Sequence, residues 1–361
     1  MKRLIISLAI IITGFCAFSQ QMEFDWITQA GGPGWDIVTD INELPNGNLA
    51  VVGTFYESIN FPNDTLYSKG SRDIFIAKYA PDGSLQQLTS IGGQGYDYVK
   101  TLEIFGENEL ILPIKFYQDL EISGKTFESN FSNNFLISWL DQNLTLTNSF
   151  LLGSTKEFDI SSIQAEPDGG CLFTGWFSDT LMVENIVYEA KAEKDIFVGK
   201  LNANGGLLWL KHFQGEGNDI ATNIISTPEN VSLLIGTTTK GCFDVENNPK
   251  FKGDKYTHIF LVELDSLGNT QTISYPFSGV EIEPVDALVD SNSVLFLANI
   301  KNPVYTARNE KISPIENSDI LLIKVDRNSQ ETEYFLLGGT SNDLADGLIK
   351  SGENILVTGL F

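Results

Sequence analysis

Histidine is almost absent from this chain: among 361 residues the only two are His212 and His258. They fall at unrelated points of the sequence pattern described below. The sequence therefore offers almost nothing from which to build a histidine metal site or a histidine-based catalytic triad. A phosphate-binding P-loop is also lacking, and the Gly-Gly-x-Gly turns lead into predicted strands rather than helices, which argues against a nucleotide-binding fingerprint.

Cysteine is scarce as well, with three residues in the whole chain. Cys16 lies in the N-terminal leader and follows Phe15, where a lipoprotein signal would have a small residue, so we disfavour a lipid anchor. Cys171 and Cys242 fall at different points of the repeat, and no bridge between them is implied. A chain of this length can bury its own core, which excludes a scaffold that depends on disulfides.

Basic residues are few: 23 Lys and Arg stand against 47 Asp and Glu, a net charge of −24. Charge of this sign repels nucleic acid and anionic membrane surfaces, and we expect neither as a partner. It is compatible with binding of a cation such as calcium. No EF-hand or nonapeptide calcium spacing is present, however, and a soluble exported surface is the favoured interpretation.

Only the N-terminus carries a long apolar run. Lys2 and Arg3 precede the apolar segment Leu4 to Ile12, and Ala17-Phe18-Ser19 places small residues at both cleavage positions. This pattern predicts a secretory signal peptide over residues 1–19 and a mature chain of residues 20–361. Without these two of the 23 basic residues, 21 remain against 47 acidic ones, a charge of −26. No later segment has the ~18 apolar residues that span a bilayer.

A repeat dominates the remainder. The stretch Asp73 to Leu85 reads as a buried strand, a tight turn at Pro81-Asp82-Gly83 and the start of a second strand. It returns with first positions 61, 61, 63 and 61 residues apart, at Asn134, Asp195, His258 and Asp319. A fixed period of this size indicates a repeat architecture. The units span about 31–91, 92–152, 153–213, 214–277 and 278–337, with a partial unit at 338–361.

Each unit divides into the same pieces. A glycine-rich turn is followed by an aspartate, a strand and a polar turn, and then by an apolar strand that ends near a small residue such as Gly53 or Gly175. Unit two has Pro113 and unit five Ala298 at that place. A small hairpin is predicted before the Asp-Ile-Phe strand. The hairpin tips, Glu184-Asn185 and Glu246 to Pro249 among them, vary most and are where recognition would be placed.

Four main strands per unit and no helical periodicity predict one all-β body. The third strands, such as Ile74 to Ala77, are apolar at successive positions, so both faces of each sheet must be covered. Radial packing achieves this and predicts a β-propeller of five full blades and half of a sixth, open or truncated. The segment Trp26 to Ala30 could supply a fourth strand to close a ring. We expect Phe361 not to be the natural end of the protein.

The pattern Gly-Gly-x-Gly-x-Asp, then Gly-Asn with an apolar strand to Gly, then Asp-Ile-Phe-Ile-Ala-Lys and Asp-Gly, resembles the SBBP β-propeller repeat family of exported bacterial proteins. The resemblance covers Trp26 to Phe361 and is closest over Gly31 to Gly93 and in unit three. Unit five departs most, with Glu281 or Glu283 near the aspartate position. The resemblance implies the fold and export to the cell surface or medium; it implies no reaction.

The aspartates that follow the glycine turns are the candidate site. If they begin the innermost strands, their carboxylates form a ring at one mouth of the central channel. The favoured interpretation is structural: each accepts hydrogen bonds from amides of its glycine turn and fixes the entry of the strand. Cation binding by the ring is the alternative. The members are Asp36, Asp97, Asp159, Asp219 and Asp343.

Two other residue sets have a structural and a functional interpretation. The Asp and Lys of the third strand, as in Asp73 and Lys78, lie five apart and so face opposite sides of the strand, each toward a neighbour. Aromatic residues after the second strand are expected in the core between blades, with carbohydrate stacking as the minority interpretation. These are Tyr56, Phe116, Trp176 and Phe177.

Together these features predict a secreted or cell-surface β-propeller that serves as a binding or scaffold module for an extracellular protein or glycan. We expect no catalysis and no cofactor. Two alternatives remain: an extracellular carbohydrate-active enzyme that uses channel-mouth carboxylates, which would need only two of them, and structural spacer repeats of a large adhesin.

Overall fold

The computed structural model describes residues 25–239, 256–290, 292–329, 331–351 and 354–360. These residues form an all-β structure of 31 strands, with no helix among them. The expected signal peptide with Lys2 and Cys16, together with Cys242, the tip Glu246 to Pro249 and Phe361, lies outside the described residues.

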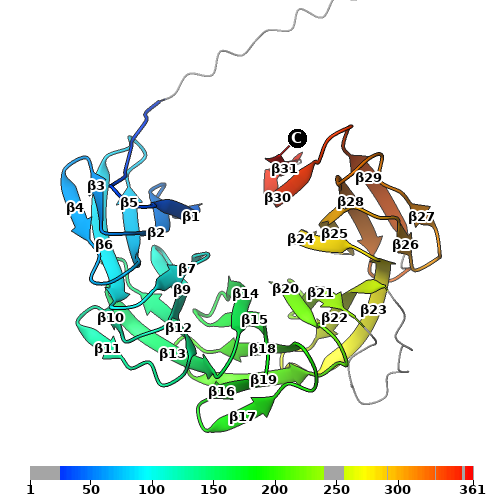
Figure 1. Cartoon of the computed structure of the whole chain (residues 1–361), viewed down its shortest axis with the longest axis horizontal. Coiled ribbons are helices and arrows are strands. Elements are labelled where there is room, and N and C mark those ends of the chain that lie inside the picture. The colour runs from blue at the N-terminus through cyan, green and yellow to red at the C-terminus, as the bar shows by residue number, and fades with distance from the viewer. Residues whose placement is uncertain (1–24, 240–255, 291, 330, 352–353, 361) are drawn as a thin grey trace, which may run out of the picture.

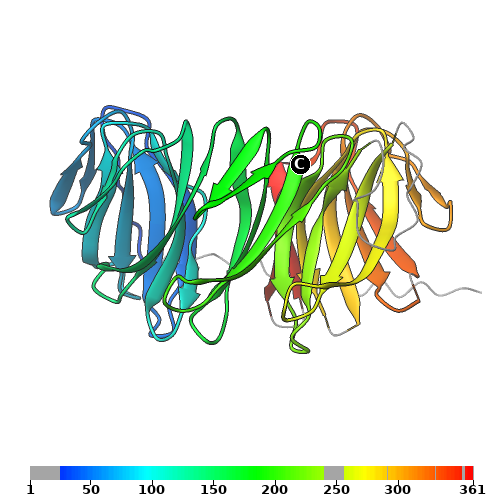
Figure 2. The ribbon, with the colours of Figure 1, turned by 90° about the horizontal axis from the view of Figure 1, so that it is seen from below.

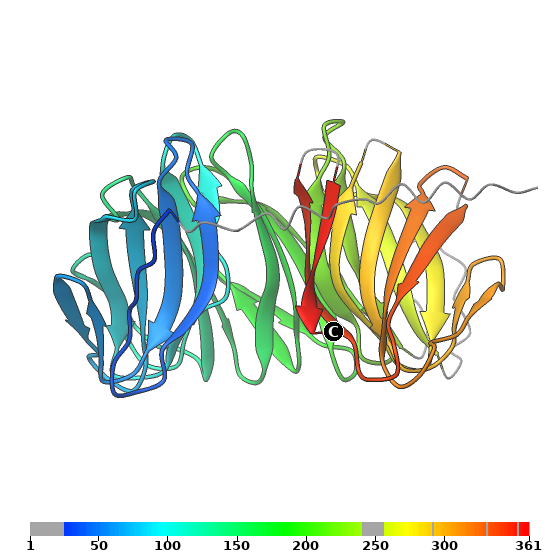
Figure 3. The same ribbon diagram turned by 90° about the horizontal axis from the view of Figure 1, so that it is seen from above.

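Five antiparallel sheets, each with four main strands, stand side by side around an open arc, and a two-stranded sheet follows them at its end (Figure 1). Each sheet is one sequence unit, and its four main strands are neighbours in chain order. Edge-on views show the strands running between the two flat faces of the arc (Figures 2 and 3). The first strands of the units line the inside of the arc (Figure 1).

The main strands match the predicted pieces of the repeat. Unit one has β1 (Ile37–Glu43), β2 (Leu49–Phe55), β5 (Asp73–Tyr79) and β6 (Leu85–Gly93). Unit two has β7 (Asp97–Val99) with β8 (Glu103–Phe105), β9 (Glu109–Phe116), β12 (Asn133–Leu140) and β13 (Leu146–Ser154). Unit three has β14 (Phe158–Ala165), β15 (Cys171–Phe177), β18 (Asp195–Leu201) and β19 (Leu207–Phe213).

The later units repeat this arrangement. Unit four has β20 (Ile220–Ser226), β21 (Ser232–Thr238), β22 (Thr257–Leu264) and β23 (Thr270–Gly279). Unit five has β24 (Ile282–Val289), β25 (Ser293–Ile300), β28 (Asp319–Asp326) and β29 (Thr332–Leu337). Unit six has β30 (Leu344–Ser351) and β31 (Asn354–Leu360).

The predicted hairpins of units one, two, three and five are present, and that of unit four lies outside the described residues. Those of units two, three and five add to the fourth strand of the preceding unit, so that the sheet of unit one continues from β6 into its neighbour's hairpin. The hairpins are β3 (Ser58–Phe61) with β4 (Asp64–Tyr67), β10 (Leu120–Ile122) with β11 (Lys125–Phe127), β16 (Thr180–Val183) with β17 (Ile186–Glu189), and β26 (Val304–Thr306) with β27 (Lys311–Ile312).

The N-terminal segment contacts the hairpin of unit one in the same way as the fourth strand of unit one contacts the hairpin of unit two. Gly31 bridges to Asn60 of β3, as Gly92 of β6 pairs with Glu121 of the next hairpin. Trp26 donates its indole N–H to the carbonyl of Pro81 at 2.9 Å in the turn after β5. Residues 26–30 themselves are not assigned to a strand.

The glycine that ends the second strand makes room for an aromatic ring. Gly53, Gly175 and Gly236 each pair with a phenylalanine of the third strand. A Cβ atom on any of them would come within 2.7 Å of that ring. Unit two has Leu136 in place of the phenylalanine, and its partner at this register is Ile114. Our placement of Pro113 at the glycine position was therefore wrong by one residue.

The hydrophobic core consists of layers between adjacent sheets. Ile74 and Ile76 of β5, for example, belong to one buried cluster with Leu112 and Leu136 of unit two. Each such side chain contributes about 1.5–3 kcal/mol when it is fully buried. In a unit that lies between two others, the third main strand has a neighbouring sheet on each of its faces. Both faces are therefore apolar, and apolar and polar residues do not alternate along the strand.

The predicted Asp and Lys of the third strand do face different neighbours. Asp73 accepts the hydroxyl of Ser68 and the N–H of Lys69 at 2.9 and 3.0 Å. Lys78 donates to the carbonyls of Asn108 and Gln142 in unit two, both at 3.1 Å. The aspartate thus holds the preceding turn while the lysine fastens two units together.

Candidate binding site in the central cavity

The predicted aspartates do not line one common surface. Asp36, Asp97 and Asp343 each accept the N–H of a glycine four residues earlier, at 2.6, 2.7 and 2.7 Å. Asp97 and Asp219 are fully buried and Asp343 nearly so, within their turns. The carboxylates of Asp36, Asp97 and Asp343 therefore hold the entry of the first strand, and that of Asp219 is buried in its turn, so the four do not surround an opening.

Asp159 is the exception, because it lies one residue out of register. Phe158 pairs with Phe177 as Asp97 pairs with Phe116, so Phe158 occupies the place that an aspartate has in the other units. Asp159 points to the other face of the strand and lines the cavity on the inside of the arc. The structure thus separates it from the other four members of the candidate ring.

The cavity inside the arc has a volume of about 820 Å³ and is lined by the first strands of all six units. Its wall contains five carboxyl groups and one lysine, Lys100. The cavity is therefore acidic and disfavours an anionic occupant. The five acidic residues are Asp40, Glu103, Asp159, Asp286 and Asp346.

Three of these carboxylates bridge neighbouring units. Asp40 accepts the N–H of Leu102 at 2.9 Å, and Glu103 accepts that of Ala165 at 3.1 Å. Asp286 accepts the N–H of Leu348 at 3.0 Å. In each case donor and acceptor are 62 residues apart. These groups satisfy backbone donors on the inner strands, and their role is to hold the arc together.

The bridges occur where the first strand is irregular. Five of the first strands have a β-bulge at the same repeat position, among them β1 between Val38 and Asp40 and β24 between Pro284 and Asp286. A bulge leaves backbone groups unpaired. A polar side chain recurs at this position in five units: Asp40, Thr101, Ser162, Asn223 and Asp286. This position was not identified from the sequence, although the residues recur with the period of the repeat.

Asp159 and Trp176 are paired across β14 and β15, and both line the cavity. The ammonium group of Lys194 lies 3.5 Å from the centroid of the Trp176 ring, a cation–π contact that holds the indole. Lys115 donates to the carbonyl of Phe158 at 2.9 Å. An aromatic ring, a carboxylate and nearby lysines therefore meet on one wall of the cavity.

Burial is the largest influence on the pKa of several carboxyl groups in this region. It raises the pKa of Asp159, and the positive charges of Lys115, Lys100 and Lys194 oppose it. Burial also raises the pKa of Glu103 to about 7, with the N–H of Ala165 acting in the opposite direction. Among the aspartates at the glycine turns, burial raises the pKa of Asp97 and Asp219 to about 7.

The four aromatic residues expected after the second strands lie at or just beyond the ends of these strands and have different environments. Phe116 and Phe177 are fully buried, as expected for the core. Tyr56 stacks under the guanidinium of Arg72, whose Cζ lies 5.4 Å from the ring centroid. Only Trp176 of the four lines the cavity.

The two histidines lie on different units, His212 on β19 and His258 on β22. His212 contacts Asp195 at 2.8 Å and Gln214 at 3.3 Å on the outer part of unit three. Within the part of the chain that the structure describes, no three His, Cys, Asp or Glu side chains are grouped to hold a metal ion. Cys171 is buried, and burial raises the pKa of its thiol. None of the described residues forms a helix able to cross a bilayer.

Comparisons with known proteins leave the family open. No family model matches the chain, and no curated protein matches it. Two solved structures of Synechocystis apocarotenoid oxygenase, one of them cobalt-substituted, align at 9% and 8% identity with TM-scores of 0.43 and 0.39. They cover 90% and 84% of this chain, which spans 65% and 62% of theirs.

A third solved structure is the extracellular domain of a one-component system from B. thetaiotaomicron. It aligns at 10% identity with a TM-score of 0.20, and the alignment covers 89% of this chain and 63% of that one. The chain thus spans less than two thirds of each of these structures.

Proposed function

We propose that the protein is an exported β-propeller of the SBBP-like repeat type and that it acts as a binding module for an extracellular glycan. The signal-peptide pattern supports export. The period of 61–63 residues and the meander sheets arranged around an arc with their first strands inside support the propeller.

One observation carries the choice of site: Asp159 departs from the turn position of the other aspartates and stands beside Trp176 in the cavity wall. An indole face stacks on the apolar side of a sugar ring, and a carboxylate accepts hydrogen bonds from its hydroxyl groups. Most of the other residues that line the cavity are also polar and offer hydrogen-bonding groups to sugar hydroxyls.

The charge of the cavity limits the class of glycan that it can bind. Five carboxyl groups and one lysine line the cavity, which favours a neutral glycan or one with amino groups over a uronic acid or sulfated glycan.

Hydrolysis is the less favoured function. A glycosidase needs two carboxyl groups placed across the scissile bond, whereas Asp40, Glu103 and Asp286 are engaged by backbone N–H groups of neighbouring units.

A glycan array tests this proposal. The protein comprising residues 20–361 is applied to neutral, amino-sugar and anionic glycans, and the bound ones are incubated with it to detect cleavage. We expect binding confined to neutral or amino-containing glycans, with no reducing ends released. Binding of none of them, or only of anionic ones, contradicts the proposal, and release of reducing ends would favour the hydrolase instead.

A further inference from the structure

Arg72 and Lys194 occupy the same position in units one and three, immediately before the aspartate that begins the third main strand. Each places its positive charge on aromatic rings. The Nζ of Lys194 lies 3.5 Å from the ring centroid of Trp176 in the cavity wall. The Cζ of Arg72 lies 5.4, 5.7 and 5.7 Å from the centroids of three tyrosine rings. These are Tyr56, Tyr96 and Tyr98.

The guanidinium of Arg72 is held by these rings rather than by an acidic side chain. In the described part of the chain, no Asp or Glu forms an ion pair with it, and its Nε–H is buried without an acceptor. The N–H of Asp97 donates to the carbonyl of Arg72 at 2.9 Å, which fixes the turn. Tyr96, which precedes Asp97, is 48% exposed. The remaining N–H groups of a guanidinium without an acidic partner are available to a ligand.

Tyr98 connects this tyrosine cluster to the wall at Trp176. It pairs with Lys115 across β7 and β9 at the register at which Asp159 pairs with Trp176 across β14 and β15. The two pairs thus occupy the same place on neighbouring units (Figure 1). Burial raises the pKa of Tyr98, the charge of Asp159 raises it further, and that of Arg72 opposes both. Tyr98 therefore lies close to both the carboxylate and the guanidinium.

Units four and five lack the aromatic ring and the cation at these positions. The strand registers place small polar residues there instead: Thr237 and Asn299 in place of Trp176, and Thr257 and Ser318 in place of Arg72. The main strands are the same in these units, so the fold does not require the ring and the cation. Their concentration on three adjacent units indicates a binding surface.

We propose, on the basis of the glycan binding inferred above, that the site extends from Trp176 past Tyr98 to Tyr96 and that its ligand is a linear, neutral oligosaccharide. One sugar of the chain lies on Trp176 in the cavity. A later sugar stacks on the exposed ring of Tyr96, and Arg72 donates hydrogen bonds to its oxygen atoms. Tyr96 is then a second stacking platform, which a short ligand does not reach.

The charges along this surface select against charged sugars. The cavity wall holds five carboxyl groups and one lysine, which repel an anionic sugar. Outside the cavity, the positive charges of Arg72 and Lys194 repel the amino group of an amino sugar. Sugar hydroxyl groups both donate and accept hydrogen bonds, so a neutral chain suits both parts of the surface.

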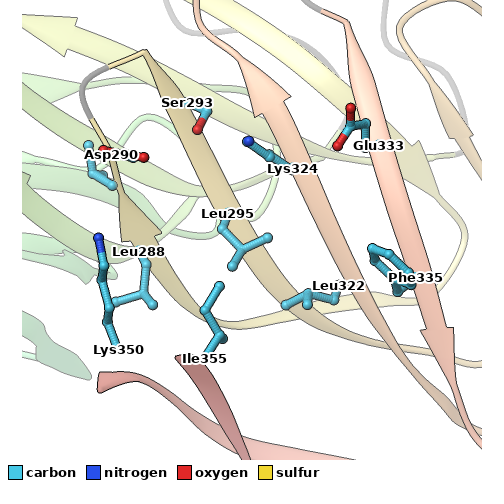
Figure 4. A pocket seen from close by; sticks show the side chains of 11 residues that line it. Leu288, Asp290, Ser293, Leu295, Leu322, Lys324, Glu333, Phe335, Lys350 and Ile355 are labelled. Atoms are coloured by element: carbon cyan, nitrogen blue, oxygen red, sulfur yellow. The ribbon is translucent and has the colours of Figure 1, made fainter. Parts of the chain in front are cut away.

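An apolar pocket on unit five provides a control. It has a volume of about 250 Å³ and contains the ring of Phe335 beside Leu295 and Leu322 (Figure 4). Phe335 is 69% exposed. Unit four stands between this pocket and unit three (Figure 1). Loss of this aromatic ring should therefore not affect a glycan chain that lies on units one to three.

Neutral oligosaccharides of increasing length test the proposal. Cello-, xylo- and malto-oligosaccharides, from the monosaccharide to the hexasaccharide, are titrated into the protein of residues 20–361 by calorimetry. In at least one series, we expect the hexasaccharide to bind at least about tenfold more tightly than the disaccharide. Tyr96→Ala should weaken binding of the hexasaccharide at least about fivefold and leave that of the disaccharide unchanged. Trp176→Ala should weaken binding of both, and Phe335→Ala of neither.

The outcomes separate the extended site from glycan binding itself. A hexasaccharide that binds no more tightly than the disaccharide, or that Tyr96→Ala binds as tightly as the wild type, would overturn the extended site. Binding of the disaccharide that depends on Trp176 would still support the proposed function. Chitosan oligosaccharides, with an amino group on each sugar, should gain less affinity with length, and an equal gain would overturn the choice of a neutral chain. If no neutral series binds, the extended site is wrong, and the glycan array decides the proposed function.

Discussion

The ring of Phe260 lies against Gly236, so closely that a Cβ atom on this glycine would be 2.6 Å from its Cζ and 2.1 Å from the carbonyl oxygen of Ile220. The relationship recurs as Gly53 with Phe75 and Gly175 with Phe197. Where the third strand has leucine instead, the second strand has Ile114 or Ala298. The two positions therefore change together because they share one volume.

A double-mutant cycle tests this pairing. Gly236→Ala should destabilise the protein by about 1–3 kcal/mol through overpacking, measured as the free energy of unfolding in urea. Phe260→Leu in the same chain should recover at least about 0.5 kcal/mol of that loss, because the two residues are in contact. Purely additive effects would show that the ring does not set the requirement for glycine.

The buried carboxyl groups predict a pH dependence of stability. The folded-state pKa of Asp97 is raised from 3.8 to about 7, mainly by burial. Its contribution to stability is therefore fully present below about pH 4 and is lost as the pH rises to about 7, because the folded state binds the proton more tightly. We expect a lower Tm at pH 8 than at pH 5, and a smaller difference in Asp97→Asn.

Asp82→Asn is the control for this experiment. Asp82 is exposed, and the hydroxyl and N–H of Ser84 lower its pKa from 3.8. It titrates below the tested range, so the difference in Tm between pH 5 and pH 8 should match the wild type. An unchanged difference in Asp97→Asn would contradict the assignment of the titration to this group.

The inner-strand bridges predict that two cavity carboxylates differ in their effect on stability. Asp40→Ala leaves the N–H of Leu102 without its acceptor, which should cost about 1–3 kcal/mol. Asp346 is exposed in the same cavity, and Asp346→Ala should change the free energy of unfolding by less than about 0.5 kcal/mol. Equal effects of the two substitutions in urea unfolding would contradict the bridging role of Asp40.

Much of the fold could be predicted because the repeat is strong in its third strand. The succession of apolar residues in β5, β18 and β28 shows that both faces are covered, and the structure confirms the strands. The hairpins could also be predicted from the sequence. Their pairing with the fourth strand of the preceding unit could not. Pairing of β10 with β6 depends on how two units lie in space, which no local pattern records.

The site was harder to predict, because a shift of one residue reverses the direction of a side chain on a strand. Asp159 stood near the expected place in the repeat, yet it follows Gly153 by six residues, whereas Asp97 follows the equivalent Gly92 by five. That difference in spacing was a signal of the changed register. The bridging position of Asp40 was overlooked because its partner, Leu102, belongs to the next unit.

The central claim, that the wall at Trp176 binds a glycan, is tested most directly by the affinity of one array-positive glycan for three proteins: wild type, Trp176→Ala and Trp35→Ala. Trp35 is 80% exposed and does not line the cavity. Loss of an aromatic platform typically costs about 1–3 kcal/mol, so calorimetry should show at least about fivefold weaker binding in Trp176→Ala and no change in Trp35→Ala. Unchanged affinity in a folded Trp176→Ala protein would contradict the claim.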